Sequence, residues 1–242
     1  MNSGKASSMR EFRRPHHQLV WQVLESMDRT FLAEVKCWFA GGTRIALEID
    51  EYRESIDVDF LCASTAGYRA IRSTVTSATF GPLFRHQPEL LRDIRTDRYG
   101  VRAWLTVDNH PLKLEIVLEG RTAIGGVHDD DFPVAVLDHQ SCLVEKLLAN
   151  SDRGRDASTQ SRDLIDLAFM VSSWNDINAQ AALATTESAY GDSIRRDLRY
   201  ALDRFADTVV RRRALEALAI TNEEPLDHGL SRLDRLLAGT HD

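Results

Sequence analysis

Residues 39–61, FAGGTRIALEIDEYRESIDVDFL, contain two adjacent glycines, a short helix-like run and a strand-like run with two acids. The apolar run before the glycines, residues 35–40, is typical of a buried strand, and TRIALE after them is typical of a helical turn. Gly41 and Gly42 therefore predict a strand-to-helix turn. Glycine lacks the Cβ that would keep backbone N–H groups away from phosphate oxygens, and Thr43 opens a helix whose N-terminus favours an anion. The turn is thus a predicted phosphate site, although a glycine pair alone is more often a tight connection.

Asp57 and Asp59 are separated by one residue in a run, residues 55–62, whose alternation is typical of a strand. Because side chains alternate across a strand, both carboxylates project from one face, while Val58 and Phe60 point to the other, buried face. Neighbouring carboxylates repel each other, and one or two bound Mg²⁺ ions with phosphate co-ligands would relieve that repulsion. The alternative is a surface strand whose polar face happens to carry two acids.

Seven residues of this stretch resemble the first motif of the DNA polymerase β-like nucleotidyltransferases: Gly41, Gly42, Thr43, Arg53, Ser55, Asp57 and Asp59. More narrowly, the chain is similar to the AbiEii/AbiGii toxins of type IV toxin–antitoxin systems. The resemblance implies an NTP substrate, Mg²⁺ at the two aspartates, and nucleotide contacts from the other five residues. The interval between the glycines and the aspartates is slightly longer than the superfamily pattern, which we assign to a looser loop at IDEYRE.

A site of this class needs a third carboxylate on a neighbouring strand. The strand-like run PLKLEIVLE, residues 111–119, offers Glu115, with Lys113 on the same face. Glu115 is therefore the predicted third metal ligand, although a solvated carboxylate paired with Lys113 would give the same pattern. By resemblance an aspartate is common here; glutamate keeps the charge and lengthens the side chain.

The resemblance also implies a lysine and an RDxxD helix in the second half of the chain. Lys146 flanks the apolar stripe of its predicted helix, so its ammonium could reach a cleft and contact the triphosphate; as the alternative, it is an ordinary exposed lysine. Asp163 and Asp166 share one face of an otherwise apolar helix and need partners. As catalytic residues they could orient the lysine, hold the nucleotide or act as general base; otherwise they favour the helix start and pair with Arg162.

An arginine-rich helix is predicted across residues 195–213, where several acid and base pairs four residues apart indicate a solvated surface. Arg211, Arg212 and Arg213 have no matching acids immediately around them in sequence. They are the predicted contacts for an RNA phosphate backbone.

The chain is predicted to be α+β first and all-α afterwards. Strand-like runs recur at residues 90–96, 100–108 and 112–119, and helical periodicity dominates the remainder. By resemblance the fold class is a polymerase β-like mixed sheet with flanking helices, followed by an all-α C-terminal region. We place a nucleotidyltransferase domain at residues 1–125 and a helical domain at residues 126–242.

The composition limits the classes of function. The 242 residues are 43% hydrophobic, enough for a substantial core, and the net charge of −7 argues against bulk attraction to nucleic acid. Three widely spaced cysteines predict reduced core thiols rather than disulfides or a zinc site. No apolar run indicates a signal sequence or a membrane span, so we expect a cytoplasmic protein without a membrane partner.

The leading hypothesis is a Mg²⁺-dependent nucleotidyltransferase that transfers NMP from an NTP and releases pyrophosphate. By resemblance the acceptor is the 3′ end of tRNA, and a cognate antitoxin protein restrains the enzyme. The second hypothesis keeps the reaction but uses a small-molecule acceptor, such as an aminoglycoside, or a protein hydroxyl. The third is a non-catalytic nucleotide-binding interaction module, against which the retained acids at positions 57, 59 and 115 argue.

Overall fold

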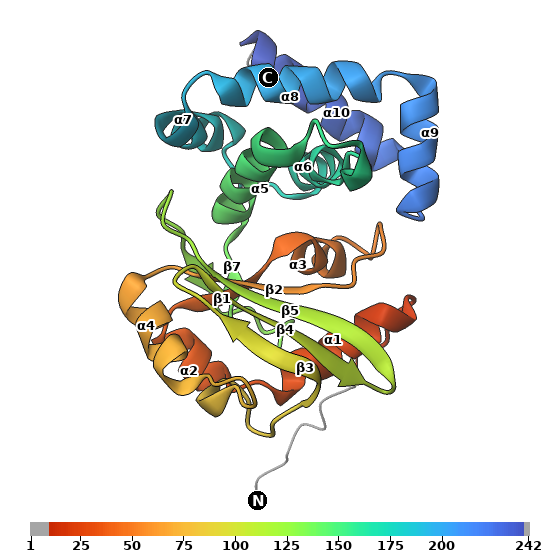
Figure 1. The fold of residues 1–242 in the computed structure, drawn as a ribbon. Helices are drawn as coiled ribbons and strands as arrows, with labels where there is room; N and C mark the ends of the chain where they lie inside the picture. The colour runs from red at the N-terminus through yellow and green to blue at the C-terminus, as the bar shows by residue number, and fades with distance from the viewer. Residues whose placement is uncertain (1–9, 240–242) are drawn as a thin grey trace, which may run out of the picture.

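The computed structural model describes residues 10–239, which form a mixed sheet flanked by helices and, above it, a layer of helices (Figure 1). The seven strands lie in the order β3-β4-β5-β2-β1-β7-β6. Their bounds are β1 Cys37–Ala40, β2 Val58–Cys62, β3 Glu89–Thr96, β4 Gly100–Val107, β5 His110–Leu118, β6 Gly126–Val127 and β7 Val136–Leu137. The predicted fold class, an α+β sheet followed by an all-α region, is confirmed.

The helices divide between the two sides of the sheet. Those that accompany the sheet are α1 Pro15–Ser26, α2 Arg29–Glu34, α3 Gly41–Glu48 and α4 Thr65–Thr74. Those of the helical layer are α5 His139–Arg153, α6 Arg162–Ser173, α7 Ala179–Tyr190, α8 Ser193–Phe205, α9 Thr208–Ala217 and α10 Glu224–Ala238. Figure 1 shows α1, α2 and α4 below the sheet and α3 between the sheet and the helical layer.

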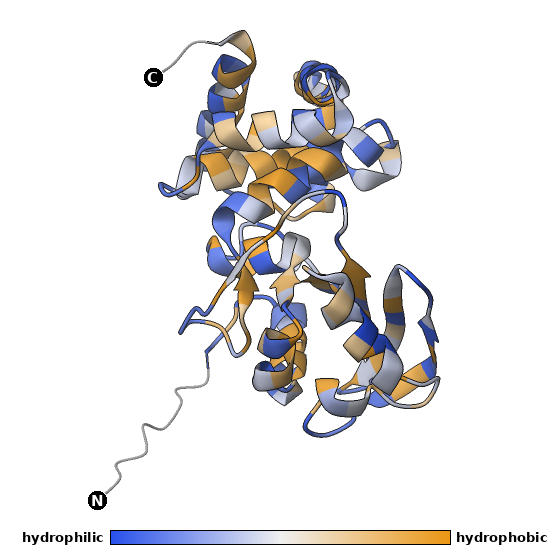
Figure 2. Ribbon diagram, turned by 90° about the vertical axis from the view of Figure 1, so that its left-hand side faces the viewer, coloured by the Kyte–Doolittle hydropathy of each residue, from blue (hydrophilic) through white to orange (hydrophobic). Residues whose placement is uncertain are grey.

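Two hydrophobic cores follow from this arrangement. One lies between the sheet and the helices below it, and it takes the inward side chains of β1, β2, β4 and β5. The other fills the helical layer, where hydrophobic residues run through its centre in Figure 2. Ala40, Ile45 and Leu137 belong to this second core, so the end of β1, the helix α3 and the strand β7 are packed against the helical layer. The Gly41 turn therefore lies where the two cores meet.

Two features differ from the sequence-based expectation. The chain returns to the sheet after residue 125, because β7 pairs with β1 and β6 pairs with β7, and the helical layer begins only at His139. The division into domains at residues 125 and 126 stays a prediction. The arginine-rich helix is two helices, α8 and α9, since the Asp207 carboxylate accepts hydrogen bonds from the N–H groups of Val209 and Val210 and starts a new helix.

Other expectations agree with the structure. The three cysteines, at positions 37, 62 and 142, are buried and form no disulfide. None of the helices in the described part of the chain has the length and apolar character that crossing a bilayer requires.

Candidate active site

The glycine turn is built against one of the predicted metal ligands. Strand β1 ends at Ala40, whose register partner on β2 is Asp59, and Gly41 begins α3 with a φ of +75°. A Cβ on Gly41 would lie 2.4 Å from the Oδ2 atom of Asp59. Only glycine therefore satisfies both the backbone conformation and the approach of the carboxylate.

Gly41→Ala is expected to lower the free energy of unfolding by roughly 1–3 kcal/mol and to reduce activity, because the methyl group strains the turn and displaces the Asp59 carboxylate. Urea denaturation and a nucleotidyl-transfer assay measure the two effects. Gly191→Ala is the matched control, since Gly191 has a similar φ of +68° but nothing within 4 Å of its added Cβ. Equal, unimpaired activity in both variants would contradict the proposed contact.

The acidic strand has the predicted alternation. Val58 and Phe60 are fully buried in the lower core, while Asp57, just before β2, and Asp59 are half-buried. Glu115 on β5 is the register partner of Asp59, so the predicted third acid stands beside the second on the neighbouring strand.

The electrostatics of this group are unfavourable for ionised carboxylates. Burial, followed by the charges of Asp57 and Glu115, raises the pKa of Asp59 to about 6, although Lys146 and Lys113 oppose the shift. When burial and neighbouring carboxylates raise the pKa of a carboxyl group, a bound dication stabilises its ionised form because the dication offsets the repulsion. The chemistry of these hard oxygen donors therefore fits Mg²⁺.

Glu115 is engaged by two cations. Its carboxylate lies 2.6 Å from the Lys113 ammonium and 3.2 Å from the Nε atom of Arg102, so the pairing with Lys113 considered from the sequence is observed. Within residues 10–239 no group of three His, Cys, Asp or Glu side chains is arranged to hold a metal ion. Asp57 and Asp59 could hold a dication with phosphate oxygens, and Glu115 would share its carboxylate between that ion and its two cations. Its role as third ligand stays a prediction.

A cavity of about 190 Å³ lies at the acidic strands, and of the three predicted metal ligands Asp59 and Glu115 line it whereas Asp57 does not. It brings together the glycine turn, the acidic strands and one face of α5, through Gly41, Asp59, Glu115, Glu145, Lys146 and Arg153. The cavity therefore joins the sheet to the helical layer. The lysine predicted from the second half of the chain lines the same cavity as the carboxylates of the first half.

Beneath the cavity lies a buried cluster of charges. The Lys146 ammonium is 2.7 Å from Asp166 and 3.1 Å from Asp163. Two arginines each bind one of these acids in a bidentate manner: Arg53 contacts Asp166 at 2.6 and 2.9 Å, and Arg153 contacts Asp163 at 2.7 and 2.8 Å. Three cations thus face two carboxylates, and one positive charge in excess remains beside the cavity.

The two aspartates of the RDxxD helix therefore have a different environment from a general base. Both are buried, and neither lines the cavity. Burial raises the pKa of Asp163, but Lys146 and Arg153 outweigh it and lower that pKa; Arg53 and Lys146 likewise lower the pKa of Asp166. Such stabilised carboxylates hold protons weakly. Of the roles considered from the sequence, orienting Lys146 matches these contacts, whereas general base catalysis and pairing with the adjacent Arg162 do not.

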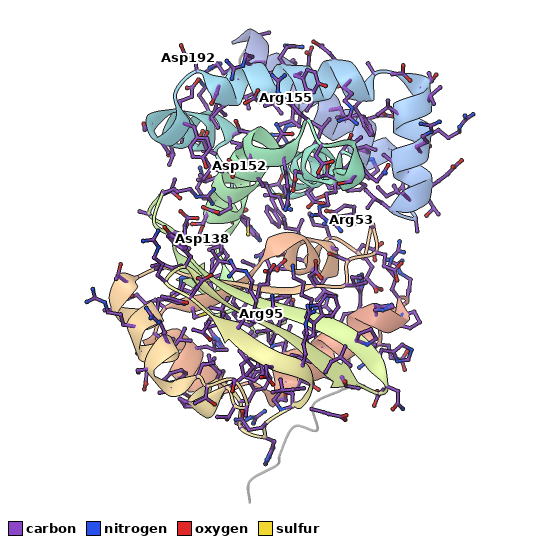
Figure 3. The ribbon with its side chains drawn as sticks, viewed as in Figure 1. Arg53, Arg95, Asp138, Asp152, Arg155 and Asp192 are labelled. Carbon is purple, nitrogen blue, oxygen red and sulfur yellow. The ribbon has the colours of Figure 1, made fainter. Side chains whose placement is uncertain are left out.

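Three of the predicted nucleotide contacts instead hold the loop before β2. The fully buried Thr43 hydroxyl lies 2.8 Å from the Ser55 hydroxyl and donates to the Asp57 carbonyl at 2.6 Å. Arg53 lies between the sheet and the helical layer (Figure 3), and a Cβ on Gly42 would meet its guanidinium at 2.0 Å. These contacts hold the backbone of the loop that leads to Asp57. Nucleotide binding by these residues, and by Gly42, stays a prediction.

Sequence reasoning missed two charged cavity residues on α5. Arg153 lies seven residues after Lys146, two helical turns along the same face, and this spacing could have identified it. Glu145 is bound by Arg121 at 2.9 Å, and burial together with the charge of Glu119 raises the pKa of Glu145 to about 7. The partner of Glu145, Arg121, is distant in sequence, so no local pattern indicated that Glu145 belongs to the site.

The predicted RNA contacts on α9 are not all free. Arg211 forms ion pairs with Glu223 at 2.6 Å and with Asp227 at 2.7 Å, acids that lie outside its immediate sequence neighbourhood. The acids come from α10 and the turn before it, which the local sequence around Arg211 does not show. Arg212 and Arg213 are exposed, and their contact with RNA stays a prediction.

Comparison with known proteins agrees with this geometry. The model of a family described as "Nucleotidyl transferase AbiEii toxin, Type IV TA system" matches residues 23–237, nearly the whole chain. The protein is therefore a nucleotidyltransferase. More narrowly, it belongs to the AbiEii toxin family of type IV toxin–antitoxin systems.

Two further comparisons add little. No match was found among curated proteins. Among solved structures, an antigenic nucleotidyltransferase-like protein from Paracoccidioides brasiliensis aligns with 88% of this chain and 92% of its own at 12% identity, with a TM-score of 0.29. A TM-score this low does not establish a shared fold.

Proposed function

We propose that the protein is a Mg²⁺-dependent nucleotidyltransferase that attaches NMP from an NTP to the 3′ end of tRNA, and that a cognate antitoxin protein restrains it. The 3′ hydroxyl oxygen bonds to the α-phosphorus, the bond from that phosphorus to the β-phosphate breaks, and pyrophosphate and the hydroxyl proton are released. The observation that carries the proposal is the cavity in which Gly41, Asp59 and Lys146 meet.

The residues of the cavity and the neighbouring Asp57 divide the work of the reaction. Asp57 and Asp59 would hold magnesium, with Glu115 as a third ligand, and the bound ion would polarise the phosphate oxygens. The missing side chain at Gly41 lets the Asp59 carboxylate lie against the turn, and the cavity that both residues line would take the phosphates. Lys146 and Arg153 add positive charge beside the leaving pyrophosphate, where charge develops during transfer.

The test is incubation of the protein with each α-labelled NTP, Mg²⁺ and total tRNA, followed by electrophoresis. Labelled tRNA supports the proposal, and the label should disappear with EDTA. Added aminoglycosides and the protein itself are the other acceptors to examine. Label in either of these, with none in tRNA, would contradict tRNA as the acceptor, and no transfer at all would contradict the reaction.

Lys146→Ala is expected to lower the rate of transfer by roughly 10²–10³, the scale seen when a fixed charge-stabilising group is lost. The fold should survive, because Asp163 keeps Arg153 and Asp166 keeps Arg53 as bidentate partners. Single-turnover pyrophosphate release measures the rate, and circular dichroism checks the fold.

Lys36→Ala is the matched control for this variant. Lys36 is exposed and precedes β1, at the end of that strand opposite the glycine turn. A folded Lys146→Ala protein with the rate of the control would remove Lys146 from the reaction.

A further inference from the structure

The face of the sheet that carries the acids continues onto β4 and β3. Asp59 on β2 is paired with Glu115 on β5, Glu115 with Arg102 on β4, and Arg102 with Arg95 on β3. Paired residues of neighbouring strands point to the same face, so these four side chains form one row across the sheet. Figure 3 shows Arg95 at the front of the sheet, away from the helices below it.

A second row lies beside the first. Lys113 on β5 is paired with Trp104 on β4, and Trp104 with Arg92 on β3. The intervening residues of β4, Val101, Ala103 and Leu105, point to the opposite face and are buried in the lower core. The alternation confirms that both rows lie on the face that carries the site.

The two cations of the rows that lie farthest from Asp59 and Glu115 are free to bind a ligand. Arg92 and Arg95 are exposed, and neither forms an ion pair within residues 10–239. Arg102 and Lys113 lie closer to the site and already contact Glu115. The acids in this area are Asp97, which pairs with Arg102, and the exposed Glu89 and Asp93 of β3. With Glu115, these acids equal the four cations in number, so the surface has no net positive charge. Its phosphate contacts would come from the two arginines of β3 that form no ion pair within residues 10–239.

An aromatic ring lies among these cations. Trp104 is half-buried on the face opposite the core, and the Arg92 guanidinium carbon is 5.1 Å from the ring centroid. Bases of single-stranded nucleic acid stack on aromatic rings and guanidinium planes, while nearby cations bind the phosphates. An acidic protein surface would use the cations but not the ring. The combination of cations and an aromatic ring therefore favours single-stranded nucleic acid as the ligand.

The dimensions suit a short segment of that strand. Three strand-to-strand steps separate β3 from β2, which is about 14 Å at the usual spacing of about 4.8 Å. At about 3.4 Å per nucleotide, this is room for roughly four stacked nucleotides. The row ends at Asp59, the acid that lines the cavity.

We propose that this surface, defined as Arg92, Arg95, Arg102, Trp104 and Lys113, binds the single-stranded 3′ end of the RNA acceptor and leads its terminal hydroxyl to Asp59. The proposal rests on the proposed function and adds the path of the acceptor. Phosphates bind the arginines and Lys113, and a base stacks on Trp104 beside Arg92.

The experiment measures binding of a fluorescent single-stranded oligoribonucleotide to the full chain by anisotropy at several salt concentrations. Arg92→Glu with Arg95→Glu should weaken binding at least about tenfold and reduce the salt slope by about 1.4, since two phosphate contacts to a single-stranded nucleic acid are lost. Trp104→Ala should weaken binding about tenfold or more through the lost stacking, with an unchanged salt slope. Binding of a fluorescent NTP analogue should stay the same in all variants.

Arg69→Glu with Arg72→Glu is the matched control. Both residues are exposed on α4, which packs on the opposite face of the sheet, and the change in charge is identical. An equal loss of RNA affinity in the control would show that the change in net charge causes the loss, and it would overturn the proposal. We call Arg92→Glu with Arg95→Glu the β3 variant. A loss of RNA affinity in Arg212→Glu with Arg213→Glu, with none in the β3 variant, would overturn the proposal in favour of α9 as the RNA-binding element.

Failure of this proposal and failure of the proposed function give different results. If wild-type protein labels tRNA and the β3 variant labels it with an unchanged KM, the binding surface is contradicted and the function stands. If wild-type protein binds the oligonucleotide through this surface but transfers no nucleotide to RNA, the function is contradicted and the surface stands.

Discussion

Asp59→Asn is expected to reduce nucleotidyl transfer by about 10³-fold or more, because the loss of one anionic ligand removes several kcal/mol of transition-state stabilisation. Asp57→Asn should have an effect of the same order. Rapid-quench transfer assays with saturating NTP and Mg²⁺ measure the loss. Asp108→Asn is the control, since Asp108 is exposed in the turn between β4 and β5 and has a positive φ that asparagine tolerates.

Asp59→Asn should also make the metal-free protein more stable at neutral pH. The pKa of Asp59 is about 6 in the folded chain, against 3.8 for an unperturbed aspartate, so the unfolded chain ionises first as the pH rises. Ionised Asp59 therefore costs the folded state on the order of 2 kcal/mol above pH 6, a cost that fades toward pH 4. Asparagine removes it.

Thermal unfolding without metal tests the sign of this effect. At pH 7 the melting temperature of Asp59→Asn should exceed that of the wild type by roughly 5 °C, and near pH 4 the two should agree. Added Mg²⁺ and a non-hydrolysable NTP should then stabilise only the wild type. A variant that is less stable than the wild type at pH 7 would contradict the cost that burial and the neighbouring carboxylates place on ionised Asp59.

Asp166→Ala is expected to lower the free energy of unfolding by about 3–5 kcal/mol, the usual cost of leaving a buried charge without its partner. Asp166 is fully buried and contacts Arg53, Lys146 and the Tyr52 hydroxyl. Its removal leaves Arg53 without an acid and releases the loop that leads to Asp57. Chemical denaturation measures the stability.

Asp234→Ala is the control for an exposed ion pair. Asp234 pairs with Arg199 at the surface, and its removal should change stability by less than about 1 kcal/mol. If Asp166→Ala were as stable as this control but lost its catalytic rate, Asp166 would act in the chemistry rather than in positioning Arg53 and Lys146.

Features that depend on local pattern could be predicted from the sequence. The alternation around Asp57 and Asp59, the glycine turn and the strand that carries Glu115 follow from periodicity within short runs. The structure places the predicted Lys146 in the cavity that Gly41 and Asp59 line. The family resemblance, rather than spacing alone, indicated that Lys146 in the second half of the chain belongs to the same site as the acids of the first half.

Features that depend on distant partners could not be predicted. Asp166 shares a face with Asp163, and the pattern indicated that both need partners, but the bidentate partner of Asp166, Arg53, lies 113 residues earlier. The acids that pair with Arg211 lie on α10 and just before it rather than beside Arg211 in sequence. Long-range ion pairs of this kind leave no periodic trace in one sequence.

The central claim is that Asp57 and Asp59 hold a dication that grips the triphosphate beside Gly41. The most direct measurement is a crystal structure of the protein with Mg²⁺ and a non-hydrolysable NTP. We predict magnesium at about 2.1 Å from oxygens of both aspartates and of the triphosphate, with the phosphates against the glycine turn and Lys146. A triphosphate bound away from this turn, or a metal ion that contacts neither aspartate, would contradict the account.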